Sequence, residues 1–145
     1  MMYLLDTNVV SEMRKIRGAH SPKAKINWHV KVWLESVPAS SLYLSVITIL
    51  ELEIGFHLLE RRDPAQAEVI RSWIRNHILP AFSGRILDVD IDVVQRCAAL
   101  HVPDPQDDRD SLIAATALVH SMTVVTRNVS HFARSGVKVL NPWEA

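Results

Sequence analysis

Short apolar runs alternate with helix-length amphipathic segments along the chain, and this alternation constrains the fold more than any other feature of the sequence. Runs of four residues typical of buried strands lie at residues 2–5, 42–45, 86–89, 123–126 and 137–140. Segments with helical spacing lie at residues 27–36, 48–61, 65–79, 91–101 and 108–121. Strands that alternate with helices of this length favour βα units. The sequence therefore predicts an α/β fold with a mostly parallel central sheet of about five strands, flanked by helices.

Length and composition fit one globular domain over residues 1–145. Hydrophobic residues make up 48% and charged residues 22% of the chain, a balance that supports a buried core and argues against disorder. Lys and Arg total 16, as do Asp and Glu, so no overall basic charge indicates a nucleic-acid partner. The single cysteine, Cys97, excludes an internal disulfide. Residues 42–50 are too short an apolar run to span a bilayer, so we expect a soluble cytoplasmic protein with no membrane partner.

The zero net charge hides two segments of opposite sign. Residues 13–34 contain six Lys or Arg and no acid, whereas residues 88–110 contain seven Asp and two Arg. One interpretation is that both segments are solvated surfaces. The other is a basic arm that holds phosphates and a carboxylate cluster that holds cations. The polar residues at the strand ends bear on this choice.

Asp6 directly follows the first predicted strand. In open parallel sheets, ligands bind beyond the carboxyl ends of the strands, so Asp6 is a candidate site residue. Thr7 and Asn8 come next, and Asp, Thr and Asn are also common N-caps because their side chains accept hydrogen bonds from the free amides of a helix. The position alone leaves both roles open.

Glu51 lies within an apolar helical pattern. On the second predicted helix it shares a face with Ile47, Ile54 and Leu58, so we expect it to interrupt a stripe that faces the core. A charge on such a face is costly unless it is paired or bound to metal. A structural salt bridge is one explanation, and we favour a functional role.

Asp110 repeats this pattern near the start of the last predicted helix. The residues three, four and seven positions later are Ile113, Ala114 and Ala117. Asp107 and Asp108 are explained by the favourable interaction of acids with a helix N-terminus. Asp110 lies deeper in the helix and is followed by a packed face, which makes it the third candidate site carboxylate.

Asn128 follows the fourth predicted strand, so an amide joins three carboxylates at the carboxyl ends of the sheet. Oxygen ligands of this kind suit Mg²⁺ or Mn²⁺. A hard cation held there can activate water and neutralise the charge that develops on a phosphodiester. The seven histidines show no paired metal-ligand spacing, so we expect them on the surface or in the core.

Together these residues resemble the PIN-domain ribonucleases, specifically the toxins of the VapC and FitB type. The resemblance covers nearly the whole chain and depends on the order and spacing of its motifs. These are LLDTNVVSE at residues 4–12, SVITILELEIG at 45–55, DSLIAATA at 110–117, HSMTVVTRN at 120–128 and NPW at 141–143.

The resemblance implies a Mg²⁺- or Mn²⁺-dependent endoribonuclease that is the toxin of a type II toxin–antitoxin pair. It implies that Asp6, Glu51 and Asp110 are metal ligands, in agreement with the reasoning from the residues themselves. One position departs from the family pattern: Asn128 matches the fourth acidic position, and His131 matches a nearby alternative for it. We retain Asn128 as a candidate catalytic residue.

The resemblance also implies a homodimer and inhibition by a VapB-type antitoxin. Apolar surface on the predicted helices 48–61 and 65–79 is a candidate docking area for either partner. The basic arm, from Arg14 to Lys25, would hold the RNA backbone near the metal.

Three other functions compete with this hypothesis. An aspartyl-phosphate phosphatase also begins with a strand that ends in Asp, but it needs a second Asp where this chain has Asn8. A nucleotide-binding domain is disfavoured because the four glycines form no phosphate-binding loop. The third alternative is a PIN-fold binding protein that has lost turnover while still binding antitoxin or RNA, and Asn128 is its best support.

Overall fold

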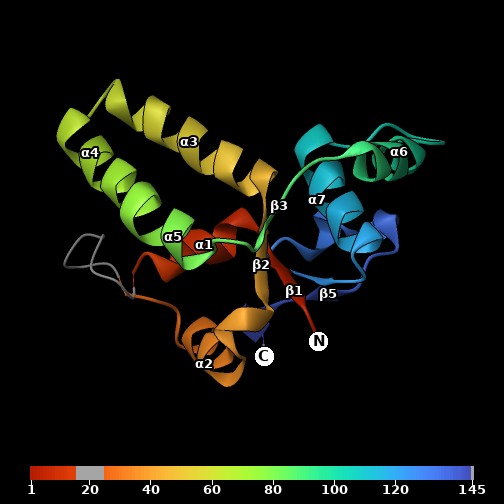
Figure 1. Cartoon of the computed structure of the whole chain (residues 1–145), viewed down its shortest axis with the longest axis horizontal. Coiled ribbons are helices and arrows are strands. Elements are labelled where there is room, and N and C mark those ends of the chain that lie inside the picture. The colour runs from red at the N-terminus through yellow and green to blue at the C-terminus, as the bar shows by residue number, and fades with distance from the viewer. Residues whose placement is uncertain (16–24, 145) are drawn as a thin grey trace.

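The computed structural model describes residues 1–15 and 25–144. Within these residues, one sheet contains five strands in the order β3-β2-β1-β4-β5, and every neighbouring pair is parallel (Figure 1). The strands are β1 Tyr3–Leu5, β2 Leu42–Ser45, β3 Ile86–Leu87, β4 Thr123–Val125 and β5 Val139–Leu140. The predicted α/β class and parallel sheet are confirmed. The strands β1 and β4 are each one residue shorter than predicted, and the edge strands β3 and β5 are two residues shorter.

Most of the helices lie in the segments for which the helical spacing predicts them. They are α1 Thr7–Met13, α2 Trp28–Ser36, α3 Val46–Glu60, α4 Pro64–Trp73, α5 Leu79–Ala81, α6 Ile91–Leu100 and α7 Asp108–Val119. Polar side chains that accept hydrogen bonds from the first turn cap most of them, namely Asp6, Asn27, Ser45, Asp63, Asp90 and Asp107. In the described part of the chain, no helix combines the length and apolar character needed to cross a membrane.

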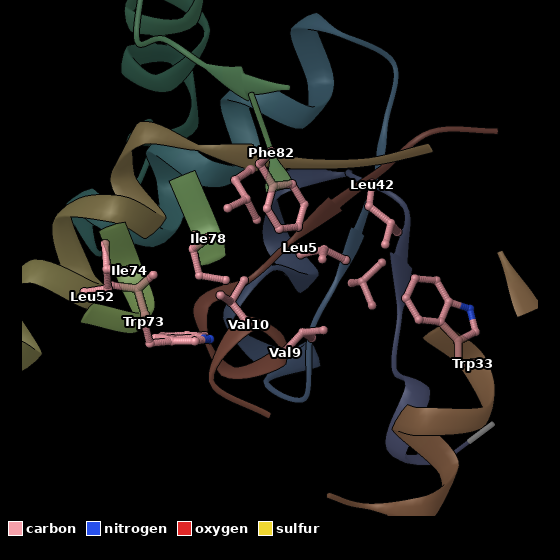
Figure 2. Packing of buried hydrophobic residues seen from close by; sticks show 12 residues of the cluster. Leu5, Val9, Val10, Trp33, Leu42, Leu52, Trp73, Ile74, Ile78 and Phe82 are labelled. Atoms are coloured by element: carbon pink, nitrogen blue, oxygen red, sulfur yellow. The ribbon is translucent and has the colours of Figure 1, made fainter. Parts of the chain in front are cut away.

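Helices cover both faces of the sheet. Successive strand residues point to opposite sides, so Leu4 and Leu5 pack against different sets of helices. Leu5 packs in one cluster with side chains of α1, α2, α3 and the segment around α5 (Figure 2). Leu4 and Val124 pack in a second cluster, chiefly against α7. The hairpin of α3 and α4 extends away from the sheet, while α6 packs on α7 on the other side (Figure 1). Both faces of β1 are therefore buried, and its carboxyl end is fixed.

The prediction that a helix ends before Pro80 is wrong. After α4 ends at Trp73, a π-helical turn follows at Ile74–Ile78, and α5 includes Pro80. In the π turn the amide of Leu79 donates to the carbonyl of Ile74, five residues earlier. Pro80 therefore lies inside a continuous helical run, directly after the π turn, where the pattern of helical hydrogen bonds already departs from that of an α-helix.

Thr48, in the first turn of α3, is fully buried, and its hydroxyl has no hydrogen-bond partner among the described residues. Thr48→Val should raise the free energy of unfolding by about 1 kcal/mol, because an unpaired buried hydroxyl costs roughly 1–3 kcal/mol. Urea denaturation measures this change. The matched control is Thr116→Val, since the buried Thr116 hydroxyl donates to the carbonyl of Leu112 at 2.7 Å. The explanation is wrong if Thr48→Val proves no more stable than the Thr116→Val control.

Candidate active site

The carboxyl ends of β1 and β4 lie side by side at the centre of the sheet. The chain adds β2 and β3 on one side of β1 and then crosses to add β4 and β5 on the other. Ligands of open parallel sheets bind at such a switch point. Leu5 and Val125 are paired in register, so Asp6 and Thr126, which follow them, are neighbours. Both are polar and buried.

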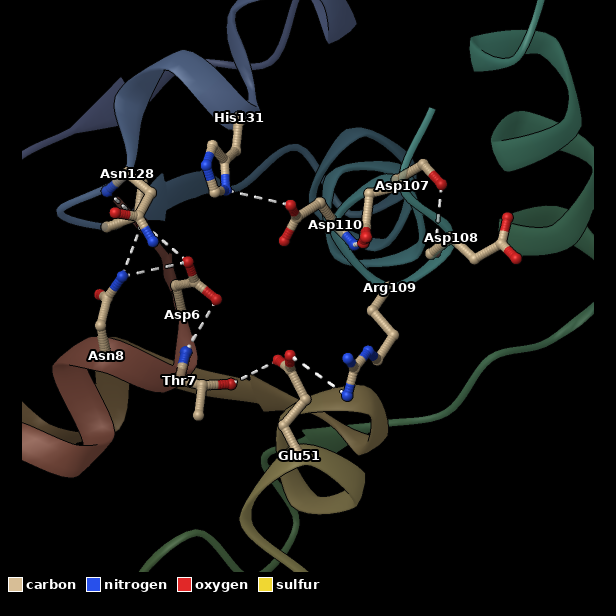
Figure 3. Close-up of polar contacts among 12 residues, drawn as sticks. Asp6, Thr7, Asn8, Glu51, Asp107, Asp108, Arg109, Asp110, Asn128 and His131 are labelled. Atoms are coloured by element: carbon tan, nitrogen blue, oxygen red, sulfur yellow. Dashed lines mark hydrogen bonds and ion pairs between the residues drawn. The ribbon is translucent and has the colours of Figure 1, made fainter. Parts of the chain in front are cut away.

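Asp6 is held by hydrogen bonds on both of its carboxylate oxygens. It is 5% exposed, and its Oδ1 accepts from the amide of Thr7 at 2.8 Å as the N-cap of α1 (Figure 3). Its Oδ2 accepts from the hydroxyl of Thr126 at 2.7 Å, and that hydroxyl oxygen accepts from the Asn8 side chain at 3.2 Å. The capping role and the position at the strand end, which the sequence left open, belong to the same side chain.

Glu51 approaches Asp6 from α3. Its Oε1 accepts from the hydroxyl of Thr7 at 2.7 Å, so Thr7 orients two carboxylates, one through its amide and one through its side chain (Figure 3). The predicted core-facing stripe around Glu51 is wrong, because Ile54 is 38% exposed and Leu58 is 62% exposed. The helix is apolar on nearly all sides, so helical spacing does not identify its buried face.

Asp110 lies in the first turn of α7, and the face that follows it is packed as predicted. The buried residues of that face include Ile113, Ala114 and Ala117. Burial raises the pKa of the Asp110 carboxyl above its ordinary value, and the negative charges of Asp107 and Asp6 raise it further. Glu51 acts in the same direction and His131 in the opposite one. The field at Asp110 therefore favours a cation.

Two further side chains line the site: Arg109, which the sequence did not single out, and His131, which the family resemblance matches to an alternative fourth acidic position. His131 Nδ1 lies 3.2 Å from Asp110 Oδ2, and Arg109 Nη1 lies 3.8 Å from Glu51 Oε2 (Figure 3). Arg109 precedes Asp110 on the first turn of α7, and His131 ends a short 3-10 turn that follows Asn128. For Arg109 the available signal was its adjacency to Asp110. For His131 the signal was the match to the family pattern, whereas its spacing from other histidines predicted only a place on the surface or in the core.

One open cavity of about 250 Å³ gathers the four candidate residues Asp6, Glu51, Asp110 and Asn128. Its other lining residues are Thr7, Asn8, Asp107, Arg109 and His131. The backbone N–H of Asn128 donates to the Thr126 hydroxyl oxygen at 3.0 Å, and Asn128, which is exposed, lines the same cavity as Asp6. The sequence therefore identified four residues that share one cavity, although they come from four separate parts of the chain.

The donor chemistry of the cavity suits a hydrated hard cation. Over residues 1–15 and 25–144, no group of three or more His, Cys, Asp or Glu side chains is arranged to hold a metal ion directly. Mg²⁺ usually keeps several waters and uses only one or two carboxylates. Carboxylates that repel one another around Asp110, with open space between them, fit such an ion better than a closed cage of protein ligands.

The basic arm is only partly described. Arg17 and Lys23 lie outside the described residues. Lys15 forms an ion pair with Glu12 at 2.9 Å, and the amide of Asn27 donates to the same carboxylate at 3.1 Å. Lys15 therefore has its charge matched within the protein.

Comparisons with known proteins agree with this geometry. The PIN domain family model matches residues 3–137. The chain is 37% identical to Toxin FitB of Neisseria gonorrhoeae, covering 98% of this chain and 99% of that protein, and 33% identical to VapC ribonuclease Y4jK of Sinorhizobium fredii, covering 99% of each. It superposes on the crystal structure of FitAcB from Neisseria gonorrhoeae with a TM-score of 0.85 and 37% identity, covering 99% of this chain and 100% of that chain. The chain belongs to the PIN-domain family and is similar to its VapC and FitB toxins.

Proposed function

We propose that this protein is the endoribonuclease toxin of a toxin–antitoxin pair and that it cleaves RNA with the help of Mg²⁺ or Mn²⁺. The observation that carries the proposal is the meeting of Asp6, Glu51 and Asp110 at one cavity, at the switch point of a PIN-domain sheet. The names of the relatives, VapC ribonuclease and Toxin FitB, support RNA as the substrate and toxicity as the role.

The chain supplies a preorganised set of charges for this reaction. A hydrated cation held among Asp6, Glu51 and Asp110, partly through its own waters, would lower the pKa of water and offset negative charge on the scissile phosphate. Thr126 and Thr7 fix the two carboxylates that they contact before any substrate arrives. Without a cation the carboxylates would repel the phosphodiester, so the same residues that enable cleavage also make it dependent on metal.

Cleavage of a total RNA pool by the purified protein tests the proposal. We expect cutting with Mg²⁺ or Mn²⁺, none with EDTA, and none with Asp110→Asn protein prepared in the same way. Cutting that persists in EDTA contradicts metal dependence. Cutting that persists in the folded variant contradicts the site.

The alternative function, a PIN-fold protein that binds but does not cleave, is supported by Asn128. An amide provides an acceptor oxygen but no negative charge, which weakens attraction for a second cation. Metal titration by calorimetry separates the two functions when the RNA pool stays intact. Mn²⁺ binding that Asp110→Asn abolishes indicates a competent site with narrow substrate selectivity, whereas absence of binding indicates a disarmed one.

We also propose a VapB-type antitoxin and a second copy of this chain as partners. A cleft of about 570 Å³ between α1, α2 and the α4–α5 segment is lined largely by apolar side chains and suits an antitoxin segment. Leu50, Ile54 and Leu58, four residues apart on α3, leave an exposed apolar stripe that suits a symmetric dimer.

Ile54→Glu should convert a dimer to a monomer, because it places a charge in the centre of that stripe. Light scattering after size exclusion measures the mass. The matched control is Glu53→Gln, which changes the residue next to Ile54 but introduces no charge into the stripe. A dimeric Ile54→Glu protein would assign the dimer contact to another surface.

A further inference from the structure

Arg109 is a charged side chain at the site to which the proposed reaction assigns no role. Its guanidinium reaches across the cavity from α7 and lies 3.8 Å from Glu51 Oε2, with the Arg109 side chain 46% exposed. In the described part of the chain it is the one Lys or Arg that lines this cavity. Four carboxylates line it as well, together with His131 and the neutral side chains of Thr7, Asn8 and Asn128, so the guanidinium of Arg109 is the permanent positive charge that a phosphate would meet there.

Other arginines near the site have different partners. Arg134, which lies close to Asp110 and His131, is paired with Asp104 at 2.7 Å. The Arg127 guanidinium lies 5.5 Å from the centre of the Trp143 ring. These contacts engage the cations beside the cavity and leave Arg109 to act within it.

The pair between Arg109 and Glu51 is loose enough to exchange. At 3.8 Å it is an ion pair without a close hydrogen bond, and half-exposed pairs of this kind contribute little to stability. Glu51 does not depend on it for orientation, because the Thr7 hydroxyl holds the other carboxylate oxygen at 2.7 Å. Arg109 can therefore leave while Glu51 stays in place.

We propose that Arg109 is a substrate-binding residue that changes partners. It neutralises Glu51 when the cation site is empty, and it binds a non-bridging oxygen of the RNA phosphate when a divalent cation takes over Glu51. This proposal rests on the proposed nuclease function. A planar guanidinium with five N–H donors is suited to two-point contact with a phosphate, which gives the substrate a fixed orientation beside Asp110.

Because Arg109 has two successive partners, its removal should have effects of opposite sign. Arg109→Gln should bind Mn²⁺ several-fold more tightly in calorimetry, because a competing cation has left Glu51. The same variant should bind a fluorescent single-stranded RNA about tenfold more weakly in Ca²⁺. The salt dependence of RNA binding should also flatten by about 0.7 in log–log slope, the value for one lost phosphate contact on a single strand.

Three controls complete the experiment. In EDTA, wild type and Arg109→Gln should bind the RNA almost equally, because Arg109 is then occupied by Glu51. Arg109→Lys keeps the charge without the planar group, so it should recover part of the affinity and most of the salt slope. Arg96→Gln, which changes an exposed arginine on α6, should alter neither Mn²⁺ nor RNA binding. Gel electrophoresis checks that the RNA stays intact.

The outcomes separate the possible failures. Weaker binding of both Mn²⁺ and RNA by Arg109→Gln would mean that Arg109 is structural, which overturns the proposal. Unchanged RNA affinity would also overturn it. If the wild type binds Mn²⁺ and RNA and Arg109→Gln binds both equally well, the role of Arg109 is refuted and the proposed nuclease function is not. A wild-type protein that binds neither refutes the nuclease function, and the role of Arg109 with it.

Discussion

Asp110→Asn is expected to lower RNA cleavage by at least about 10²–10³-fold, the cost typical of removing one electrostatic contact to the transition state, while the protein stays folded. In the metal-free protein it should also raise the melting temperature. The two effects have one cause: the carboxylate is partly buried among Asp107, Asp6 and Glu51, which is unfavourable until a cation is present. Cleavage assays and thermal melts on the same preparation measure both effects.

The sign of the stability change follows from the direction of the pKa shift. The pKa of Asp110 is raised in the folded protein, so its ionised form costs stability above the folded pKa. That cost disappears as the pH falls through the folded pKa towards the ordinary value of 3.8. The advantage of Asp110→Asn should therefore be greatest near pH 7 in EDTA and shrink near pH 4. An Asp110→Asn protein that melts below the wild type at pH 7 would show that the ionised Asp110 carboxylate does not destabilise the folded protein.

Mn²⁺ should reverse the order of stability. Binding to the folded state raises the melting temperature by mass action, and Asp110→Asn should gain much less from added Mn²⁺ than the wild type. Asp108→Asn is the matched control, because Asp108 is on the same helical turn but does not line the cavity. Equal stabilisation of all three proteins would contradict the assignment of Asp110 as a ligand.

Replacement of Asp6 should be far more costly to folding. We expect Asp6→Asn and Asp6→Ala each to lower the free energy of unfolding by about 2–4 kcal/mol, because hydrogen bonds to a charged group are worth roughly 1.5–3 kcal/mol each. Both oxygens of Asp6 accept hydrogen bonds, one from the Thr7 amide and one from the Thr126 hydroxyl. Asparagine has one oxygen and one amino group, so one of these donors would face another donor.

Urea denaturation measures the Asp6 effect, with Asp107→Asn as the control. Asp107 caps α7 through a single hydrogen bond from the Asp110 amide at 3.0 Å, so its replacement should cost under about 1 kcal/mol. An Asp6→Asn protein as stable as the wild type would mean that the buried bonds are replaceable. For assays of chemistry, Asp110→Asn is the better inactive variant because its loss of activity is not mixed with loss of fold.

The sheet was predictable from the sequence because its central strands β1, β2 and β4 are largely buried on both faces. Continuous apolar runs separated by helical segments specify parallel strands without any knowledge of tertiary contacts. The turn at Ile74–Ile78 was not predictable in this way. A π turn changes the number of residues per helical turn just before Pro80, so the helix continues through the proline. No local residue pattern predicts that change.

The site residues that follow strands were predictable, because strand order places them. Contacts that depend on how far a side chain reaches from its helix were not predictable. Asp6 and Asn128 follow neighbouring strands, so strand order alone brings them together. Glu51 was selected because its helix face was predicted to point into the core, and that prediction is wrong. Nearly all sides of α3 are apolar, so the sequence does not distinguish its exposed stripe from its buried one. The contact of Arg109 with Glu51 joins two helices far apart in sequence, and side-chain reach of this kind is absent from the pattern of either helix.

The hydrogen bond between Asp6 and Thr126 joins residues that are 120 positions apart. Proteins are synthesised from the N-terminus, so Asp6 leaves the ribosome long before the strand that completes its surroundings. Because β1 is the central strand and one of its two neighbours is β4, the sheet cannot close around Asp6 until β4 has emerged. Under the proposed nuclease function, this order of assembly would keep the growing chain harmless to its own messenger RNA through most of its translation.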